Sequence, residues 1–294
     1  MLFRSSTSHN PILGKVFLVG AGPGAVDLIT VRGARLLAQA DIVFHDALVD
    51  PAMLELCPQA IQVPVGKRCG KLSSAQHFIN KRLIDAAHKY QTIVRLKGGD
   101  PMMFGRADEE IQALKDHHIA VEVVPGVTAA LAGAASIAQS LTLRGVSRSV
   151  AFVTLAQGQD HSGATESLAE HSPLAQPSAD TLVYYMGRKD AANIAKQLIN
   201  SGIHHGTTHN SETPVHILEA VSTQNERHWS STLGQLANGE AENWFNTASP
   251  AVIMVGEALR QKAEAPTKAL QGSRSEFDDG LKDSVILTNG RRSA

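Results

Sequence analysis

The sequence predicts an α/β fold made of two domains, and three observations support this prediction. Short apolar runs rich in β-branched residues alternate with segments of helical periodicity, which is typical of a mainly parallel sheet covered by helices. The 294 residues are enough for about two domains at the usual ~150 residues per domain. A turn at Pro125 and Gly126, followed by an alanine-rich segment, separates two sets of such runs.

The first domain is expected at 14–126. Its strands are expected at 16–19, 41–45, 61–65, 92–97 and 121–124. Helical patterns lie between these runs. The helix expected at 73–90 begins with Ser73 and Gln76 in capping-box spacing. The helix expected at 107–117 has acidic residues in its first turn, where the helix dipole favours them.

A connecting helix and linker at 127–148 lead to the second domain, which is expected at 149–260. Its strands are expected at 150–155, 181–186, 214–219 and 251–256, and Gly202 should close a helix at 189–202. The segment 1–13 is expected to be a flexible N-terminus and 157–180 a polar surface insertion. The tail at 261–294 lacks apolar periodicity and is expected to be disordered.

Composition and charge argue against several classes of protein. The net charge of -1 provides no global basic field for nucleic acid, so an anionic ligand would need a local group of Lys and Arg. No stretch approaches the ~20 apolar residues that cross a bilayer, and the first residues lack the apolar run of a signal peptide. Cys57 and Cys69 form neither a CxxC pair nor a disulfide framework, which suits the cytoplasm.

The 13 histidines suggest a metal site, but their spacing argues against one. His117 and His118, like His204 and His205, are adjacent and would point apart on a regular element. The stretch "HHGTTH" has no HExxH pattern. We therefore expect no metal, and the sequence also lacks a G-x-S-x-G motif and a Walker lysine loop.

The turn "GAGPGA" (20–25) after the first strand fits G-x-G-x-x-G/A, the pattern of dinucleotide-binding turns. Asp46 ends the second strand, where an acid would meet a ribose hydroxyl of NAD. Pro23 argues against this hypothesis, because it removes a backbone donor from the turn that should hold pyrophosphate. On these residues alone, a tight turn without a ligand is favoured over a cofactor site.

The stretch "VRLKGGDPMMFGR" (94–106) places ligand-binding residue types at the end of another strand. Ligands of open parallel sheets bind beyond the carboxyl ends of the strands. Gly98 and Gly99 would allow close backbone approach there, and Asp100 would accept a hydrogen bond from an amine or hydroxyl. The apolar residues 102–104 would form a wall, and the alternative is a D-P turn with these residues in the core.

Two further strand ends carry candidate binding residues. Lys67, Arg68 and Lys71 in "PVGKRCGK" form a compact cationic group that suits a carboxylate-rich or phosphorylated ligand, although a solvated basic loop is the more common explanation. In "VVPGVTAALAGAAS", Thr128 could cap the alanine-rich helix or contact a ligand.

Five motifs in order resemble the uroporphyrinogen-III C-methyltransferases of the tetrapyrrole methylase fold. They are "VFLVGAGPGAVDLITVRGARLLAQADIVFHDALV", "VGKRCGK", "VRLKGGDPMMFGRADEE", "VVPGVTAA" and "YYMG", within about residues 14–256. The resemblance implies two α/β domains with the active site in the interdomain cleft, usually in a homodimer. It implies transfer of methyl groups from two S-adenosyl-L-methionine molecules to carbons 2 and 7 of uroporphyrinogen III. The products would be S-adenosyl-L-homocysteine and precorrin-2, which leads to sirohaem and cobalamin.

The resemblance also implies roles for single residues. Cofactor contacts, many through backbone atoms, are implied at Pro23, Gly98, Gly99, Asp100, Met103, Thr128, Ala129, Met186 and Val221. Asp46 corresponds to the family's proton acceptor and Lys67 to its proton donor. Arg68, Lys71, Arg106 and Arg144 are candidate partners for the carboxylates of the substrate.

These roles are chemically consistent. An electron-rich pyrrole carbon attacks the sulfonium methyl group in line, so positioning should supply most of the acceleration. The methylated, cationic tetrapyrrole must then lose a proton, which the carboxylate of Asp46 could accept. Lys67 could bind substrate charge rather than deliver a proton.

The sequence departs from the family's pattern at several places. Ala25 stands where the pattern "GPGD" has an acid, Ala47 where "YDRLV" has Arg, and Leu143 where "PLTHR" has His. "VTLAQ" replaces "VTGH", and "EAVS" replaces "ENGT" around Val221. These changes motivate two alternatives on the same fold: a methylase of a later corrin intermediate, and a protein that binds tetrapyrrole without turnover. An NAD-dependent oxidoreductase is the alternative from another class, and the "KGGDP" and "YMG" matches argue against it.

Overall fold

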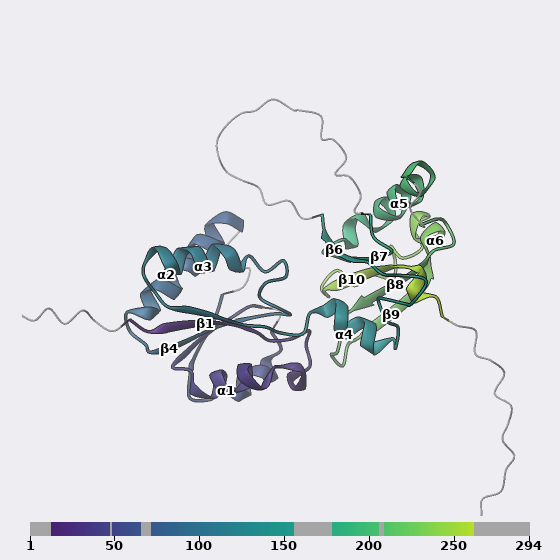
Figure 1. Ribbon diagram of the computed structural model, residues 1–294. Coiled ribbons are helices and arrows are strands. Elements are labelled where there is room, and N and C mark those ends of the chain that lie inside the picture. Colours follow the sequence, from purple (N-terminus) through teal and green to yellow (C-terminus); the bar gives the residue numbers. More distant parts are fainter. Residues whose placement is uncertain (1–12, 48, 66–71, 156–177, 206–208, 262–294) are drawn as a thin grey trace, which may run out of the picture. The chain divides into compact units, whose positions relative to one another are not determined.

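The computed structural model describes residues 13–47, 49–65, 72–155, 178–205 and 209–261 (Figure 1). The residues through Gln261 belong to one compact unit. Nearly all of the expected flexible N-terminus at 1–13, the expected insertion at 157–180 and the expected tail at 261–294 lies outside the described residues.

The first sheet contains five parallel strands in the order β3-β2-β4-β1-β5. The strands are β1 (Lys15–Gly20), β2 (Ile42–His45), β3 (Ile61–Pro64), β4 (Thr92–Lys97) and β5 (Val121–Val124). These positions and the parallel pairing confirm the strands expected for this half of the chain. Because the strands are parallel, their carboxyl ends lie at the same edge, which is where ligands of such sheets bind.

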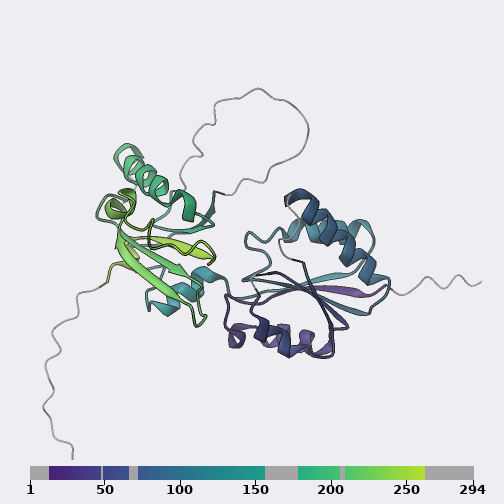
Figure 2. The ribbon, with the colours of Figure 1, turned by 180° about the vertical axis from the view of Figure 1, so that it is seen from behind.

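Helices cover both faces of the first sheet (Figures 1 and 2). The helices are α1 (Val31–Gln39), α2 (Leu72–Ala87) and α3 (Ala107–Asp116), with 3-10 helices at Val26–Leu28 and Pro51–Leu56. Leu83 of α2 and Leu114 of α3 pack in one apolar cluster with β1, β2 and β4. Leu37 of α1 packs in a separate cluster on the other face. Both faces of the central strands are therefore buried.

The second sheet has the order β6-β7-β10-β8-β9 and is mixed rather than mainly parallel. Its strands are β6 (Val150–Thr154), β7 (Thr181–Tyr185), β8 (Pro214–Glu219), β9 (Arg227–Thr232) and β10 (Ala251–Gly256). Only β6 and β7 pair in parallel, and the other three pairings are antiparallel. The strand β9 is absent from the expected strands, and the short segment 220–226 between β8 and β9 permits only an antiparallel pairing of these two strands.

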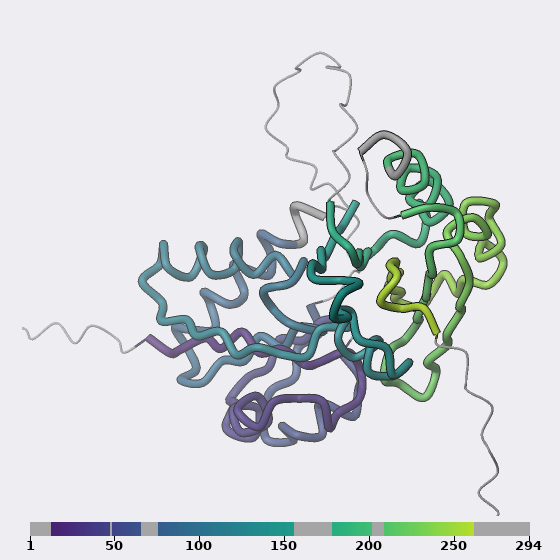
Figure 3. The backbone as a smooth tube through the Cα atoms, turned by 45° about the vertical axis from the view of Figure 1, so that its right-hand side comes forward, coloured from purple at the N-terminus to yellow at the C-terminus, as the bar shows by residue number. Residues whose placement is uncertain are grey.

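The helices of this second half also pack on two faces of their sheet (Figure 3). They are α4 (Ala129–Ser136) on one face and α5 (Ala191–His205) with α6 (Leu233–Ala237) on the other, with 3-10 helices at Arg188–Asp190 and Glu257–Leu259. The helix α5 continues past Gly202, so the expected end at this glycine is wrong. A glycine inside a helix costs only about 1 kcal/mol relative to alanine, which does not by itself end the helix.

Two histidines form a partly buried pair across β8 and β9. The Nδ1 atom of His216 lies 2.8 Å from Nε2 of His228, and Nε2 of His216 lies 2.9 Å from the carbonyl oxygen of Leu259. Because a carbonyl only accepts, His216 donates to Leu259 and accepts from His228. Burial lowers the pKa of both rings, and the neighbouring His228 lowers the pKa of His216 further.

We expect this pair to make the protein less stable as the pH falls. An unfolded histidine has a pKa of about 6.5, so below that pH the unfolded chain binds protons that the folded pair does not, and the free energy of unfolding decreases. The contribution of the neutral histidine pair to the free energy of unfolding is complete above about pH 7.5. It is lost as the pH falls through the lowered pKa values of the two rings. Melting curves of the protein and of His228→Gln between pH 8 and pH 5 test this expectation, since the variant should lose less Tm. Equal losses of Tm would contradict it.

Candidate functional site

Glycines at the ends of three neighbouring strands bring their loops into close contact. Gly22 follows β1 and Gly99 follows β4, and the two exchange backbone hydrogen bonds of 3.2 and 2.7 Å. A Cβ atom at Gly126, after β5, would lie 2.3 Å from the carbonyl oxygen of Gly99. A Cβ atom at Gly20 would lie 2.6 Å from the Cα atom of Gly126. Only a hydrogen atom fits at Gly20 and Gly126, so the strand-end glycines form one tightly packed junction.

Asp100 stabilises this junction, because both of its carboxylate oxygens accept hydrogen bonds from backbone N–H groups. Its Oδ2 accepts from the backbone N–H of Gly126 at 2.9 Å, and its Oδ1 accepts from the N–H of Met102 at 2.8 Å. The alternative of a D-P turn with apolar residues in the core is wrong for Met102 and Phe104. The exposed fraction of the surface is 61% for Met102 and 37% for Phe104. The stretch therefore presents apolar side chains beside the junction.

The turn that contains Pro23 packs against the segment around Val221. The backbone N–H of Ala25 donates to the Oγ of Ser222 at 3.0 Å. A Cβ atom at Gly24 would lie 3.0 Å from the carbonyl oxygen of Val221. The loops that carry Pro23 and Val221, two positions expected to contact the cofactor, are thus held side by side. They are almost two hundred residues apart in the sequence.

Tyr185 connects the start of α4 with the end of β7. Its hydroxyl oxygen lies 2.5 Å from the Oγ1 of Thr128 and accepts from the backbone N–H of Ala130 at 3.1 Å. Thr128 occupies the N-cap position of α4, but its side chain contacts the tyrosine rather than a helix N–H. The phenolic group of Tyr185 therefore caps the helix. Because Met186 follows Tyr185 directly, these hydrogen bonds also bring Thr128 and Ala129 close to the loop that carries Met186.

The loop after β4, which carries Phe104, contacts the end of β7, which leads into Met186. Met186 has a positive φ of 56° and is 56% exposed. The ring centroid of Phe104 lies 5.2 Å from that of Tyr185. The loops that carry all the expected cofactor positions are therefore linked by contacts between described residues.

Asp46 lies beyond the carboxyl end of β2, beside β4. Its backbone N–H donates to the carbonyl oxygen of Leu96 at 3.2 Å, and its Oδ1 accepts from Nη2 of Arg95 at 2.5 Å. Its side chain remains 31% exposed, and no described residue donates a hydrogen bond to its Oδ2. The acid is thus held in place through one oxygen, which leaves the other oxygen available to a ligand.

Three buried charged residues, Arg95, Lys97 and Glu110, lie behind Asp46. We call these three residues and Asp46 the ion cluster. Oε1 of Glu110, which lies on α3, accepts from Nε of Arg95 at 3.1 Å and from Nζ of Lys97 at 3.0 Å. It also accepts from Nε2 of Gln76, on α2, at 3.2 Å. The side chain of Glu110 is fully buried, and those of Arg95 and Lys97 are 3% exposed.

The two cations of the ion cluster respond differently to burial. Burial opposes the charge on Arg95, but the carboxylates of Glu110 and Asp46 outweigh it and raise the pKa of Arg95. Burial, together with the positive charge of Arg95, lowers the pKa of Lys97. Sequence reasoning missed Arg95, Lys97 and Glu110 because it assigned the first two to an apolar strand and the third to the helix dipole.

The remaining predicted residues are cations. Arg106 precedes α3 and forms an exposed ion pair with Glu109 at 2.5 Å, and Arg144 lies exposed in the turn between Leu143 and Ser147. Lys67, Arg68 and Lys71 lie outside the described residues.

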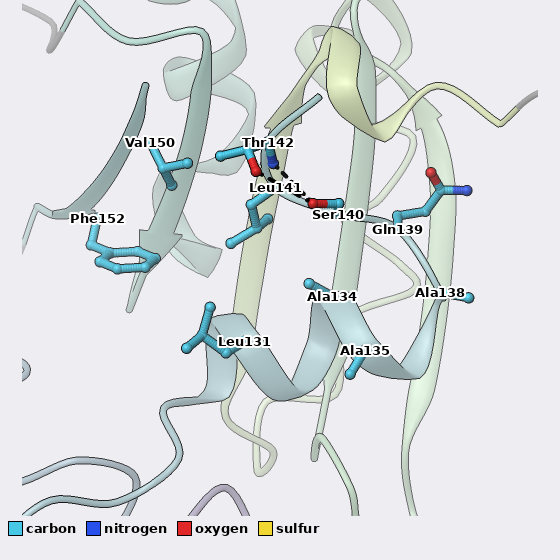
Figure 4. Close-up of a pocket in the computed structure, with 10 residues that line it drawn as sticks. All are labelled: Leu131, Ala134, Ala135, Ala138, Gln139, Ser140, Leu141, Thr142, Val150 and Phe152. Atoms are coloured by element: carbon cyan, nitrogen blue, oxygen red, sulfur yellow. Dashed lines mark hydrogen bonds between the residues drawn. The ribbon is translucent and has the colours of Figure 1, made fainter. Parts of the chain in front are cut away.

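An open hollow of about 490 Å³ lies between α4 and β6 (Figure 4). It is lined by Leu131, Ala134, Ala135, Ala138, Gln139, Ser140, Leu141, Thr142, Val150 and Phe152. None of these side chains is charged, and none belongs to the predicted site. We therefore place the candidate site at the glycine junction and Asp46 rather than in this hollow.

Metal binding and membrane insertion find no support in the part of the chain that the structure describes. Within the ranges that the structure describes, no group of three or more His, Cys, Asp or Glu side chains is arranged to hold a metal ion. No helix in those same ranges has both the length and the hydropathy required of a membrane span.

Residues 15–237 match the family described as Tetrapyrrole (Corrin/Porphyrin) Methylases. The chain is 42% identical over 253 residues to a uroporphyrinogen-III C-methyltransferase of Pseudomonas aeruginosa strain PAO1, covering 86% of this chain and 97% of that one. It is 44% identical over 252 residues to a siroheme synthase of Pseudomonas fluorescens strain Pf0-1, where it spans about half of the relative (85% of this chain, 51% of that one).

A solved structure agrees with these relatives. The uroporphyrin-III C-methyl transferase of Thermus thermophilus, complexed with S-adenyl homocysteine, superimposes with a TM-score of 0.68 at 36% identity, covering 87% of this chain and 99% of that one. The chain belongs to the tetrapyrrole methylase family. This membership confirms the resemblance and the α/β fold class, and it argues against the dinucleotide hypothesis for "GAGPGA".

Proposed function

We propose that the protein is a uroporphyrinogen-III C-methyltransferase, which uses S-adenosyl-L-methionine to methylate carbons 2 and 7 of uroporphyrinogen III and gives precorrin-2. One observation carries this proposal. The strand-end junction at Gly99 and Gly126 and the partly exposed acid Asp46 lie at the same edge of the first sheet. The names of the relatives from Pseudomonas aeruginosa and Thermus thermophilus support the same activity.

The glycine junction fits a cofactor that approaches backbone atoms. The residues that would hold it are Pro23, Gly98, Gly99, Asp100, Met103, Thr128, Ala129, Met186 and Val221. The lack of side chains at the glycines lets the loops after β1, β4 and β5 approach one another closely at the strand ends, and the exposed Met186 offers an apolar contact. When bound, S-adenosyl-L-methionine supplies an electrophilic methyl group on sulfur.

The chain's own residues then bind substrate and move a proton. Asp46 accepts the proton that the methylated, cationic ring must lose, through the oxygen that Arg95 leaves open. Lys67 is the proposed proton donor. Arg68, Lys71, Arg106 and Arg144 are the proposed partners of the substrate carboxylates, because guanidinium and ammonium groups bind carboxylates strongly.

One assay tests the proposed function. The full chain is incubated without oxygen with S-adenosyl-L-methionine and uroporphyrinogen III, and methylated product and S-adenosyl-L-homocysteine are measured by mass spectrometry. Two equivalents of S-adenosyl-L-homocysteine per tetrapyrrole are expected. Saturable cofactor binding without methylated product would contradict the proposed function and favour a later corrin intermediate as substrate.

The assembly, location, pathway and domain limits complete the proposal. We place the protein in the cytoplasm as a homodimer, and light scattering of the full chain tests the dimer. The siroheme synthase relatives support a role in sirohaem synthesis. The proposed domains are 14–126 and 149–260, with the active site between them and 127–148 as the connection.

A further inference from the structure

We propose that Glu110 is a positioning residue, which acts through Arg95 to leave one oxygen of the Asp46 carboxylate open as proton acceptor. This inference rests on the proposed function, in which Asp46 takes the proton from the methylated ring. Nothing in the sequence motifs assigns a role to Glu110, which lies on α3 and is fully buried.

The hydrogen bonds of the guanidinium group show how Glu110 would act. Nε of Arg95 donates to Glu110 at 3.1 Å, and Nη1 donates to the carbonyl oxygens of Leu96 at 3.1 Å and Phe44 at 3.5 Å. Only Nη2 reaches Asp46, at 2.5 Å. Because Arg95 is anchored on its other side, it contacts a single oxygen of Asp46.

Loss of the negative charge of Glu110 would change this contact. A guanidinium group without its own buried anion prefers a carboxylate in the bidentate arrangement, with two parallel N–H···O bonds. Arg95 would then turn toward Asp46 and occupy both of its oxygens. The carboxylate would become a poorer proton acceptor, because both oxygens would be engaged by a cation.

Stability alone does not explain the ion cluster. Oε2 of Glu110 is buried and has no hydrogen-bond partner among the described residues, which costs about 1–3 kcal/mol or more for a charged group. Buried ionic networks can often be replaced by apolar residues without loss of stability. The helices α2 and α3 are already attached to the sheet through Leu83 and Leu114. The position of the cluster directly behind Asp46 accounts for its presence better than helix packing does.

The test compares Glu110→Gln in two backgrounds. In the otherwise unchanged protein, kcat should fall about 10- to 100-fold, as expected for a misplaced reacting group. KM for uroporphyrinogen III should not rise, and calorimetric Kd for S-adenosyl-L-homocysteine should stay within about twofold. In the Asp46→Asn background the same change should alter kcat less than about twofold, because coupled residues are not additive. Glu122→Gln, which alters a partly exposed acid paired with Lys15 and Arg32, is the matched control.

Each outcome decides a different question. Absence of methylation by the unchanged protein overturns the proposed function, whatever the variants do. Methylation by the unchanged protein with normal kcat in Glu110→Gln overturns only the role of Glu110. An equal loss of kcat in both backgrounds assigns Glu110 a structural role and also overturns the inference. If Glu110→Gln does not fold, Glu110→Gln/Lys97→Met restores the balance of buried charge, and a wild-type kcat in that variant overturns the inference too.

Discussion

Asp46→Asn should lower kcat about 10²- to 10⁴-fold, the range expected when a general base is lost. The amide has nearly the same size and can still accept a hydrogen bond from Arg95, but it cannot take a proton from the methylated ring. The binding of S-adenosyl-L-homocysteine should be unchanged, because the cofactor positions lie on other loops. Single-turnover methylation and calorimetry of the same preparation measure the two quantities.

A matched control is Asp85→Asn, which changes an exposed acid that pairs with Lys81 on α2. This variant should keep both the turnover and the cofactor affinity of the unchanged protein. If Asp46→Asn instead loses cofactor affinity, Asp46 is a binding residue, and an interaction with a ribose hydroxyl becomes the better explanation.

Gly126→Ala should weaken cofactor binding at least about tenfold, which corresponds to 1.4 kcal/mol. The added methyl group would lie 2.3 Å from the carbonyl oxygen of Gly99 and 2.8 Å from the Cα atom of Gly20. These are backbone atoms, so relief requires the loops after β1, β4 and β5 to separate. Overpacking of this kind costs about 1–3 kcal/mol, so Tm should fall by several degrees. Calorimetry with S-adenosyl-L-homocysteine and thermal melting measure both effects.

Gly234→Ala is the control for the glycine junction. Its new methyl group would lie 3.2 Å from the nearest atom, the carbonyl oxygen of Ser211, and it lies on α6 in the second half of the chain. This variant should retain its cofactor affinity. Normal affinity in Gly126→Ala would mean that the junction does not form part of the cofactor site.

The central strands of the first sheet could be predicted well because burial on both faces leaves apolar runs, such as those in β1 and β2. The second sheet was harder to predict. The strand β9, "RHWSST", lies at the edge of its sheet, is mostly polar and contains no buried residue. It therefore carries no apolar pattern, and without it the antiparallel pairing of β8 could not be predicted.

Some residues of the candidate site could likewise be predicted from the sequence, and others could not. The glycine loops and Asp46 could be located because strand ends and glycines are visible in the sequence. The partners of Asp46 could not be located, since Arg95 and Lys97 are charges inside a buried strand and Glu110 satisfies the ordinary pattern of an acidic first helical turn. Glu110 does lie three residues after Ala107 and four before Leu114, both buried. This spacing on the apolar face of α3 was the available signal.

The ion cluster also matters for how the substrate arrives. A lone carboxylate at the reaction site would repel a ligand that carries eight negative charges. Here two carboxylates and two basic side chains are joined in a chain of three ion pairs, so their fields largely cancel at distances larger than the cluster itself. A charge-balanced group has no long-range monopole, and its potential decays faster with distance than that of a single ion. The proposed proton acceptor Asp46 therefore adds no long-range repulsion that would slow the encounter with a polyanionic substrate.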